Sequence, residues 1–210
     1  MNAELRELPL KFEMSSEYED LKPVVLEGKR LILRNIDWES DFKALCRWNS
    51  NPEVLSYIEE DNVPPRTEDE TRRLYEHHDR NGLLLIAELK GNGPIGEAFL
   101  NRERVPEENA YRAPIMIGEP ALWGQGLGTD ILRTLLDYCF ITLCHNSFYA
   151  FSVNSTNLRA IRMYTRCGFI PIEQVIKEGS LKNISYTNLS LKLDRKRYIA
   201  LREYFYELPY

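Results

Sequence analysis

Apolar positions follow two different periods along this chain, and each period predicts one kind of secondary structure. Short, mostly apolar runs predict strands at residues 31–33, 83–89, 95–100, 111–117, 148–153, 175–176 and 184–193. Apolar residues that recur every three or four positions predict helices at residues 37–48, 67–80, 131–143 and 156–167. Turn residues punctuate these elements, because Gly91 to Pro94 predict a hairpin turn and Asn81 with Gly82 predict the end of a helix.

The order of the predicted elements indicates the fold class. Strands come first and then alternate with helices. This order predicts an α/β domain of the α+β type, with a mixed, mostly antiparallel central sheet and helices on both faces. Within this domain, the segment from Ile115 to Val153 is expected to form a parallel strand–helix–strand crossover.

The two ends of the chain differ from the middle. Residues 1–28 are polar, rich in acids and interrupted by prolines, so we expect an N-terminal arm that packs on the domain or stays mobile. Residues 29–194 are expected to form the domain itself. Residues 195–210 are expected to form a C-terminal helical tail that docks on the domain or on a second subunit of a homodimer. Its apolar positions at helical spacing are Tyr198, Leu201, Tyr204 and Phe205.

The composition of the chain narrows the range of possible functions. A chain of 210 residues that is 43% hydrophobic fits one domain with a substantial core. Its net charge of −5 and its pI near 5.4 argue against a general binder of nucleic acid or membrane surfaces, which needs a basic face. There is no run of about 18 apolar residues and no basic, apolar leader at Met1, so we expect a cytoplasmic protein without a membrane partner.

Cysteine and histidine spacing predicts neither a metal site nor a thiol nucleophile. The four cysteines lack CxxC spacing and are expected to be reduced thiols, mostly in the core: Cys46, Cys139, Cys144 and Cys167. His77 and His78 fall on a polar helix and His145 falls in a turn, so no properly spaced third ligand is present. We therefore expect no bound metal.

The stretch from Trp123 to Thr129 carries the first chemical signal. Its three glycines join an apolar strand to a strongly amphipathic helix, so backbone N–H groups can turn toward an anion at the positive end of the helix. No Lys follows the glycines, which argues against a nucleotide triphosphate loop, and the spacing is GxGxG, which argues against a dinucleotide fingerprint. A phosphate cradle and an ordinary glycine-rich turn both remain open from this loop alone.

A second segment, from Asn154 to Phe169, favours the phosphate cradle over the ordinary turn. It contains Asn157-x-x-Ala160, Tyr164 and a closing Gly168-Phe169. Together with residues 123–129, it resembles the GNAT superfamily of acetyl-coenzyme-A-dependent N-acetyltransferases, most closely the branch of the ribosomal-protein alanine acetyltransferases and their small-molecule relatives. The resemblance covers residues 31–193 and implies the acyl-CoA N-acyltransferase fold with acetyl-CoA as cosubstrate.

The resemblance also implies the site residues. Backbone N–H groups from Gln125 to Thr129 are expected to hold the pyrophosphate. Residues 117–119 are expected to run beside the pantetheine arm, with one N–H polarising the thioester carbonyl. Asn157 is expected to bond the pantetheine. The full set of expected cofactor-binding residues is Ile117, Gly118, Glu119, Trp123, Gly124, Gln125, Gly126, Leu127, Gly128, Thr129 and Asn157.

Tyr164 is the expected catalytic residue. The resemblance implies that its phenol protonates the departing thiolate, which is a poor leaving group without a proton donor. Each assignment has a structural alternative: Asn157 as a helix cap, Tyr164 as a core aromatic, and Trp123 as a packing or adenine contact rather than a phosphate partner.

The proton acceptor is not singled out by the sequence. Glu97, Glu119 and a water wire are all candidates for taking a proton from the attacking amine. Some aminoglycoside-modifying relatives carry an Asp in the strand before the loop, at the position of Pro114 here. This departure argues against their base and their substrate class.

The acceptor is expected to be the primary amine of a small molecule, such as an aminosugar, a polyamine or an antibiotic. The resemblance implies an acceptor pocket built largely from the first two helices and their connection. The acids there suit a cationic acceptor, although a solvated acidic loop explains them at least as well: Glu59, Glu60, Asp61, Glu68, Asp69 and Glu70. Two alternatives are a protein N-terminal acetyltransferase and a non-catalytic CoA-binding regulatory module.

Overall fold

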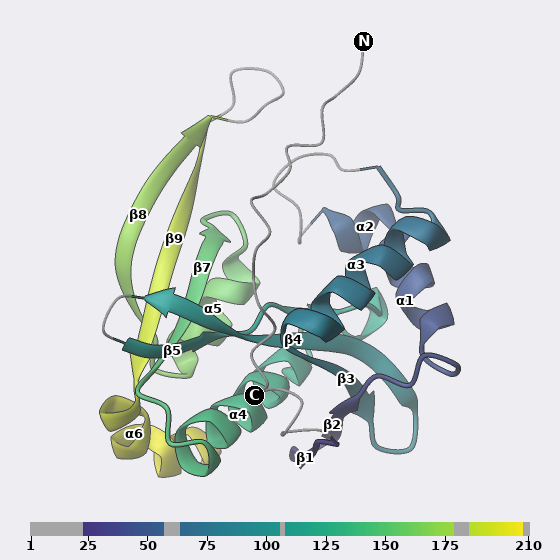
Figure 1. Ribbon diagram of the computed structural model, residues 1–210. Coiled ribbons are helices and arrows are strands. Elements are labelled where there is room, and N and C mark those ends of the chain that lie inside the picture. Colours follow the sequence, from purple (N-terminus) through teal and green to yellow (C-terminus); the bar gives the residue numbers. More distant parts are fainter. Residues whose placement is uncertain (1–22, 57–63, 106–107, 179–184, 208–210) are drawn as a thin grey trace.

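A single twisted sheet organises the chain (Figure 1), seen in a computed structural model that describes residues 23–56, 64–105, 108–178 and 185–207. Within these residues the strand order is β1-β2-β3-β4-β5-β7-β9-β8, and β6 pairs with β4 off this path. Every pairing is antiparallel except that between β5 and β7. The mixed, mostly antiparallel sheet predicted from the element order is confirmed.

The elements have the following bounds. The strands are β1 (Val25–Glu27), β2 (Leu31–Asn35), β3 (Leu83–Leu89), β4 (Gly93–Val105), β5 (Glu108–Arg112), β6 (Ile115–Ile117), β7 (Ser147–Asn154), β8 (Ile170–Glu178) and β9 (Ser185–Asp194). The helices are α1 (Phe42–Asn49), α2 (Pro52–Leu55), α3 (Glu68–Asn81), α4 (Leu127–Asp137), α5 (Leu158–Arg166) and α6 (Arg195–Glu207). A π-helical turn over Tyr138–Thr142 prolongs α4.

Alternation along the strands separates two cores, one on each face of the sheet. Leu83, Leu85 and Leu100 point to the face covered by α4 and α5, where the larger apolar cluster lies. Leu84 and Ile86 point to the opposite face, where they pack with Trp48 and Tyr75 from α1 and α3. Both sets are essentially inaccessible to solvent. The helices therefore cover both faces, as the sequence predicts (Figure 1).

The strand predicted at residues 111–117 is two strands, and this corrects the predicted crossover. β5 pairs with β7 as far as Arg112, which lies opposite Tyr149. After Ala113 and Pro114 the chain continues as β6, whose partner among the described strands is β4 alone. Because proline has no N–H to continue a ladder, the strand breaks there. The parallel partner of β7 is thus β5, and not the strand beginning at Ile115.

The ends of the domain also carry structure. β1 lies at the end of the predicted arm and pairs with β2, while residues 1–22 lie outside the described residues. The tail forms α6, as its spacing predicts, and it packs on the domain through Tyr198 and Phe205. The Tyr198 hydroxyl donates to Asp137 at 3.0 Å. Among the described helices, none is long and apolar enough to cross a bilayer.

Candidate active site

A gap opens in the sheet between β6 and β7. Beyond Arg112 and Tyr149 the described strands show no further pairing between these two segments. β7 is also irregular here, since its register with β9 shifts between Ala150 and Val153 and Ser152 has φ 54°. Two strand edges with hydrogen-bonding groups therefore face one another without joining, which leaves room for an extended ligand to bind as an added strand.

The N–H of Ile117 points into this gap. Gly118 donates its N–H to the carbonyl oxygen of Ile95 at 2.9 Å. Because alternate residues of a strand direct their amides to opposite sides, the Ile117 N–H points away from β4. The Ile117 carbonyl oxygen, on the same edge, accepts a hydrogen bond of 2.8 Å from Nε1 of Trp123. Of the predicted carbonyl-polarising amides, that of Gly118 is already used inside the sheet.

The glycine loop shapes the N-terminus of α4. Gly124 and Gly126 have φ 75° and 76°, in the left-handed region that glycine adopts without steric cost. Gly126 is the N-cap, and the N–H groups of Leu127, Gly128 and Thr129 have no carbonyl ahead of them in the helix. These amides have the geometry that the predicted phosphate cradle requires, because the positive end of a helix with unsatisfied N–H groups favours an anion.

Hydrogen bonds join the first turn of α4 to the turn between β1 and β2. Asp130 is buried, and its carboxylate accepts from the backbone N–H groups of Lys29 at 3.1 Å and Arg30 at 2.8 Å. Arg30 in turn donates to the carbonyl oxygen of Gln125 at 2.7 Å. The loop is therefore positioned before a ligand arrives, which reduces the entropy lost on binding.

A cavity of about 470 Å³ joins the loop to the gap. Thr129, Met163 and Arg166 line it on the α4–α5 side of the sheet, and Met116 and Val54 line it on the α1–α3 side. The cavity thus passes through the plane of the sheet. Eight of the predicted binding residues line it: Ile117, Trp123, Gly124, Gly126, Leu127, Gly128, Thr129 and Asn157. Gly118, Glu119, Gln125 and the predicted acid Tyr164 do not.

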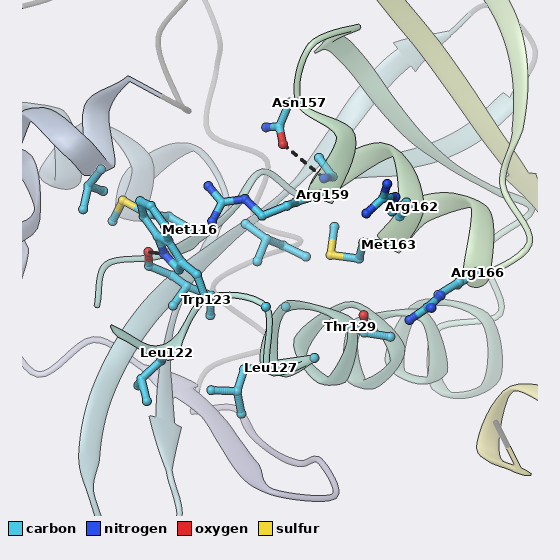
Figure 2. Close-up of a pocket in the computed structure, with 17 residues that line it drawn as sticks. Met116, Leu122, Trp123, Leu127, Thr129, Asn157, Arg159, Arg162, Met163 and Arg166 are labelled. Carbon is cyan, nitrogen blue, oxygen red and sulfur yellow. Dashed lines mark hydrogen bonds between the residues drawn. The ribbon is translucent and has the colours of Figure 1, made fainter. Parts of the chain in front are cut away.

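Three arginines on α5 line the cavity and were missed by the sequence reasoning. Figure 2 shows Arg159 reaching toward Trp123 and Arg166 directed toward Thr129, with Arg162 between them along the helix. The guanidinium of Arg159 lies 4.2 Å from the centroid of the Trp123 ring. Their spacing of three and four residues was the available signal, because it places them along one side of a helix. They add positive charge to the end of the cavity at α4.

Asn157 and Tyr164 lie on the same helix with different surroundings. Asn157 Oδ1 accepts from the N–H of Ala160 at 3.1 Å, so the cap foreseen as an alternative exists, while the residue also lines the cavity (Figure 2). Tyr164 lies one helical turn beyond Ala160 and is 7% exposed, with its ring 5.1 Å from that of Phe169. Burial raises the pKa of Tyr164 to about 12. Its hydroxyl therefore stays protonated at neutral pH.

The pKa values of the two candidate bases are shifted in opposite directions. Glu119 accepts from Nε1 of Trp48 at 2.8 Å and pairs with Arg47. Burial acts to raise the pKa of Glu119, but these two bonds outweigh it and lower the pKa overall. Glu97 lies on β4 opposite Met116, and burial raises its pKa to about 7, although hydrogen bonding by Tyr75 opposes the rise.

Only some of the acids expected around the acceptor lie among the described residues. Residues 59–61 lie outside the described residues. Glu70 forms the capping box of α3, with its Oε2 accepting from the N–H of Thr67 at 2.8 Å. This interaction explains part of the acid density by helix capping. In the described part of the chain, no group of three or more His, Cys, Asp or Glu side chains is arranged to hold a metal.

Comparison with known proteins identifies the family. Residues 30–170, well over half of the chain, match the family model described as Acetyltransferase (GNAT) domain. The chain belongs to the GNAT acetyltransferase family. It is an acyltransferase with acetyl-CoA as its cosubstrate, and the family resemblance seen in the sequence is confirmed.

The relatives of this GNAT protein are distant but cover most of its length. It is 23% identical over 188 residues to an N-acetyltransferase 9-like protein of Nematostella vectensis, covering 83% of this chain and 94% of the relative. It is 25% identical over 179 residues to spermidine N(1)-acetyltransferase of Vibrio cholerae, covering 84% and 96%.

Solved structures share the fold. The structure of Vibrio cholerae spermidine N-acetyltransferase in complex with CoA and spermine has a TM-score of 0.69 and 23% identity, covering 82% of this chain and 99% of that one. A GCN5-related N-acetyltransferase from Brucella melitensis has a TM-score of 0.72 and 16% identity, covering 88% and 85%. The acyl-CoA N-acyltransferase fold is therefore confirmed.

The residues present fit the acetyl donor. The orphan amides of α4 and the cavity arginines match the charge of a diphosphate, and the open edges at the gap match the amides of a pantetheine arm. Trp123 presents an aromatic face that Arg159 already covers. Each end of the cavity thus offers the chemistry that one part of the donor requires.

Proposed function

We propose that this GNAT enzyme transfers the acetyl group of acetyl-CoA to a primary amine of a small molecule, such as a polyamine, an aminosugar or an antibiotic. One observation carries the proposal. The cavity passes from the anion site at α4, through the gap beside Ile117, to Val54 and Met116 on the opposite face. An amine approaching from the α1–α3 side therefore meets the donor at the point where the sheet is open.

Each residue has a defined part in the proposed reaction. Acetyl-CoA supplies an activated acetyl group and a thiolate leaving group. The first-turn amides of α4 bind its diphosphate, and the N–H of Ile117 hydrogen-bonds the acetyl oxygen as negative charge develops there. The Nδ2 of Asn157 binds the pantetheine, because Oδ1 is occupied by the cap. The Tyr164 hydroxyl, protonated at neutral pH because its pKa is about 12, donates to the thiolate.

The choice of a small amine over a protein N-terminus is supported by one of the relatives, which is named a spermidine N(1)-acetyltransferase. The branch of the ribosomal-protein alanine acetyltransferases remains the alternative within the family, and a non-catalytic CoA-binding module remains the alternative outside enzymes.

A thiol-release screen tests the proposal. Acetyl-CoA is offered with spermidine, spermine, glucosamine, an aminoglycoside and peptides that begin with Ala or Ser. We expect at least one small amine to exceed every peptide by tenfold or more in kcat/KM. A preference for peptides would instead support the N-terminal acetyltransferase. Tight CoA binding without turnover across the panel would support the regulatory module.

A Tyr164→Phe variant tests the assignment of the acid. The substitution keeps the ring that packs on Phe169 and removes only the hydroxyl. We expect kcat to fall by roughly 10²-fold while the calorimetric affinity for acetyl-CoA stays unchanged, because a proton donor acts in the transition state. A kcat equal to that of the parent would remove Tyr164 from the mechanism.

A further inference from the structure

The end of β6 is joined to α1 through the side chain of Glu119. Glu119 comes two residues after Ile117, the last residue of β6, and its Oε1 accepts a hydrogen bond of 2.8 Å from Nε1 of Trp48. The same carboxylate pairs with Arg47, the preceding residue of α1. Trp48 is buried in the apolar cluster on the α1–α3 face, so its indole N–H has a fixed direction. Glu119 therefore binds a donor that cannot move freely.

The ring of Trp48 also explains the glycine at position 118. A Cβ added to Gly118 would lie 2.1 Å from Cγ of Trp48, which is far closer than two side chains can approach. The backbone after β6 therefore packs directly on the indole. Trp48 thus contacts the strand end twice, through its ring at Gly118 and through its N–H at Glu119.

These contacts bear on the amide that faces the gap. Trp123 holds the carbonyl oxygen of Ile117 from the side of the glycine loop. On the far side of Glu119 the chain turns, because the N–H of Leu122 donates to the Glu119 carbonyl oxygen at 3.0 Å. Since peptide groups are planar and each residue has only two soft torsions, a displacement at Glu119 is passed back to the Ile117 amide.

Of the two partners of Glu119, Trp48 has the larger effect on position. Arg47 is mostly exposed, and ion pairs of exposed side chains contribute little to stability. The Trp48 indole is held by its apolar neighbours, so a hydrogen bond to it fixes the carboxylate relative to α1. The strand end is thus set by helix packing as well as by its own pairing with β4.

We propose that Glu119 is a positioning residue, which fixes the end of β6 against Trp48 so that the Ile117 N–H is aimed at the acetyl oxygen of the donor. The inference rests on the proposed function, in which this N–H binds that oxygen. Glu119 does not line the cavity, so it acts through the backbone and not by contact with the donor. The strength of a hydrogen bond falls steeply as its angle departs from linear, so a small tilt of the amide weakens it.

The thioester carbonyl itself reports the direction of the Ile117 amide. Acetyl-CoA labelled with ¹³C at the carbonyl carbon is bound without an acceptor, and infrared difference spectroscopy records the carbonyl stretching band. In the parent, the hydrogen bond should place this band at a lower wavenumber than in free acetyl-CoA. Glu119→Ala should return the band toward the free position, while calorimetry shows an unchanged affinity for CoA, because the first turn of α4 is not altered.

Kinetics with the small amine that the parent acetylates best give a second readout. Loss of a whole oxyanion donor costs roughly 10²–10³ in kcat, so a misdirected donor in Glu119→Ala should cost about tenfold, with little change in the KM for acetyl-CoA. Glu119→Gln keeps an oxygen that accepts from Trp48, and its kcat should fall by only about threefold, since only the exposed ion pair is lost. A residue that accepted the proton would fail equally in both variants.

Glu88→Ala is the matched control. The Glu88 side chain is 35% exposed against 32% for Glu119, and it accepts from Nε of Arg34 at 2.8 Å, away from the cavity. We expect Glu88→Ala and Glu119→Ala to lose similar stability in urea unfolding. Only Glu119→Ala should move the infrared band and lower kcat.

A change of the partner tests whether the effect passes through the indole N–H. Trp48→Phe keeps a ring against Gly118 and removes the donor to Glu119. It should move the band in the same direction as Glu119→Ala. The double variant should move it no further than the larger of the two single changes, because both remove one bond. Additive movements would overturn the inference.

The outcomes separate the inference from the proposed function. A parent-like band in Glu119→Ala, or an equal movement in Glu88→Ala, would overturn the positioning role while the enzyme remains an amine acetyltransferase. A parent-like band with an equal loss of kcat in Glu119→Gln and Glu119→Ala would overturn it as well. The infrared measurement needs no acceptor, so a parent that acetylates no small amine would overturn the proposed function without deciding the position of the amide.

Discussion

The indole Nε1 of Trp123 donates a hydrogen bond of 2.8 Å to the carbonyl oxygen of Ile117. This bond joins the glycine loop to the strand edge that faces the gap, so the anion site and the carbonyl site are held at a set separation. Arg159 covers the same indole at 4.2 Å. Trp123 therefore connects the loop, β6 and α5.

Replacing Trp123 by Phe separates the hydrogen bond from the ring contact. The Phe ring still faces Arg159, but the Ile117 carbonyl oxygen loses its donor, which costs about 1 kcal/mol. We expect calorimetry to show acetyl-CoA binding about three- to tenfold weaker. Trp38→Phe, on the α1–α3 side, should leave the affinity unchanged. Equal affinities for Trp123→Phe and the parent would show that the bond does not position the loop.

Gly124→Ala tests the conformation of the loop against a matched control. Gly124 and Gly91 have φ 75° and 82°, and an added Cβ at either position meets no atom within 4 Å. Both Ala variants should therefore lose a similar stability, about 1–2 kcal/mol, in urea unfolding. Only Gly124→Ala should also weaken acetyl-CoA binding, because Gly124 lines the cavity and Gly91 lies in the β3–β4 hairpin. Equal effects of the two variants on binding would contradict the phosphate cradle.

Arg166→Gln tests the charge at the α4 end of the cavity. Arg166 lines the cavity near Thr129, so removing its charge should weaken CoA binding about three- to tenfold and make the affinity less sensitive to salt. Binding is measured by calorimetry at two or more salt concentrations. Arg73→Gln, at an exposed position of α3, serves as the control and should bind like the parent. Parallel salt dependences for Arg166→Gln and the parent would exclude a phosphate contact by this side chain.

His78 should lower the stability of the folded protein at acidic pH. Burial lowers its pKa from 6.5 to about 4, so the neutral imidazole stabilises the folded state above pH 6.5, and this stability is lost as the pH falls toward 4. His78→Phe keeps an aromatic ring against Phe99 and removes the titration. Between pH 6.5 and 4.5, we expect the free energy of unfolding of the parent to fall by about 1–2 kcal/mol more than that of the variant. His77→Phe, at the neighbouring exposed position, should follow the parent.

The sequence by itself determined the type and order of most elements. Local signals sufficed where the period of apolar residues, a cap or a turn agreed with the tertiary contacts. Thr67 and Glu70 form the capping box that their spacing predicts, and Gly91 turns the β3–β4 hairpin. The glycine loop and the Asn157-to-Phe169 segment likewise identified the family. The conformation of such a loop and the spacing of residues along a helix depend on the local sequence.

Other features depended on pairing that no local pattern records. One apolar run from Tyr111 to Ile117 gave two strands with different partners, since Pro114 interrupts the ladder and the gap needs β7 to diverge. The three arginines of α5 became cavity residues only because that helix packs beside α4. The sequence shows the spacing of these arginines, but it does not show which element packs beside that side of the helix.

The tertiary structure also separated two glutamates that look alike in sequence. Glu119 meets Trp48 from α1, whereas Glu97 is set under α3 beside Tyr75 and beside the open part of the sheet. The pKa of a carboxyl depends on the atoms that surround it in space, and those atoms come from segments distant in the chain. The sequence therefore supplied the candidate residues, and the packing of the helices on the sheet decided which carboxyl group has a pKa near neutral pH.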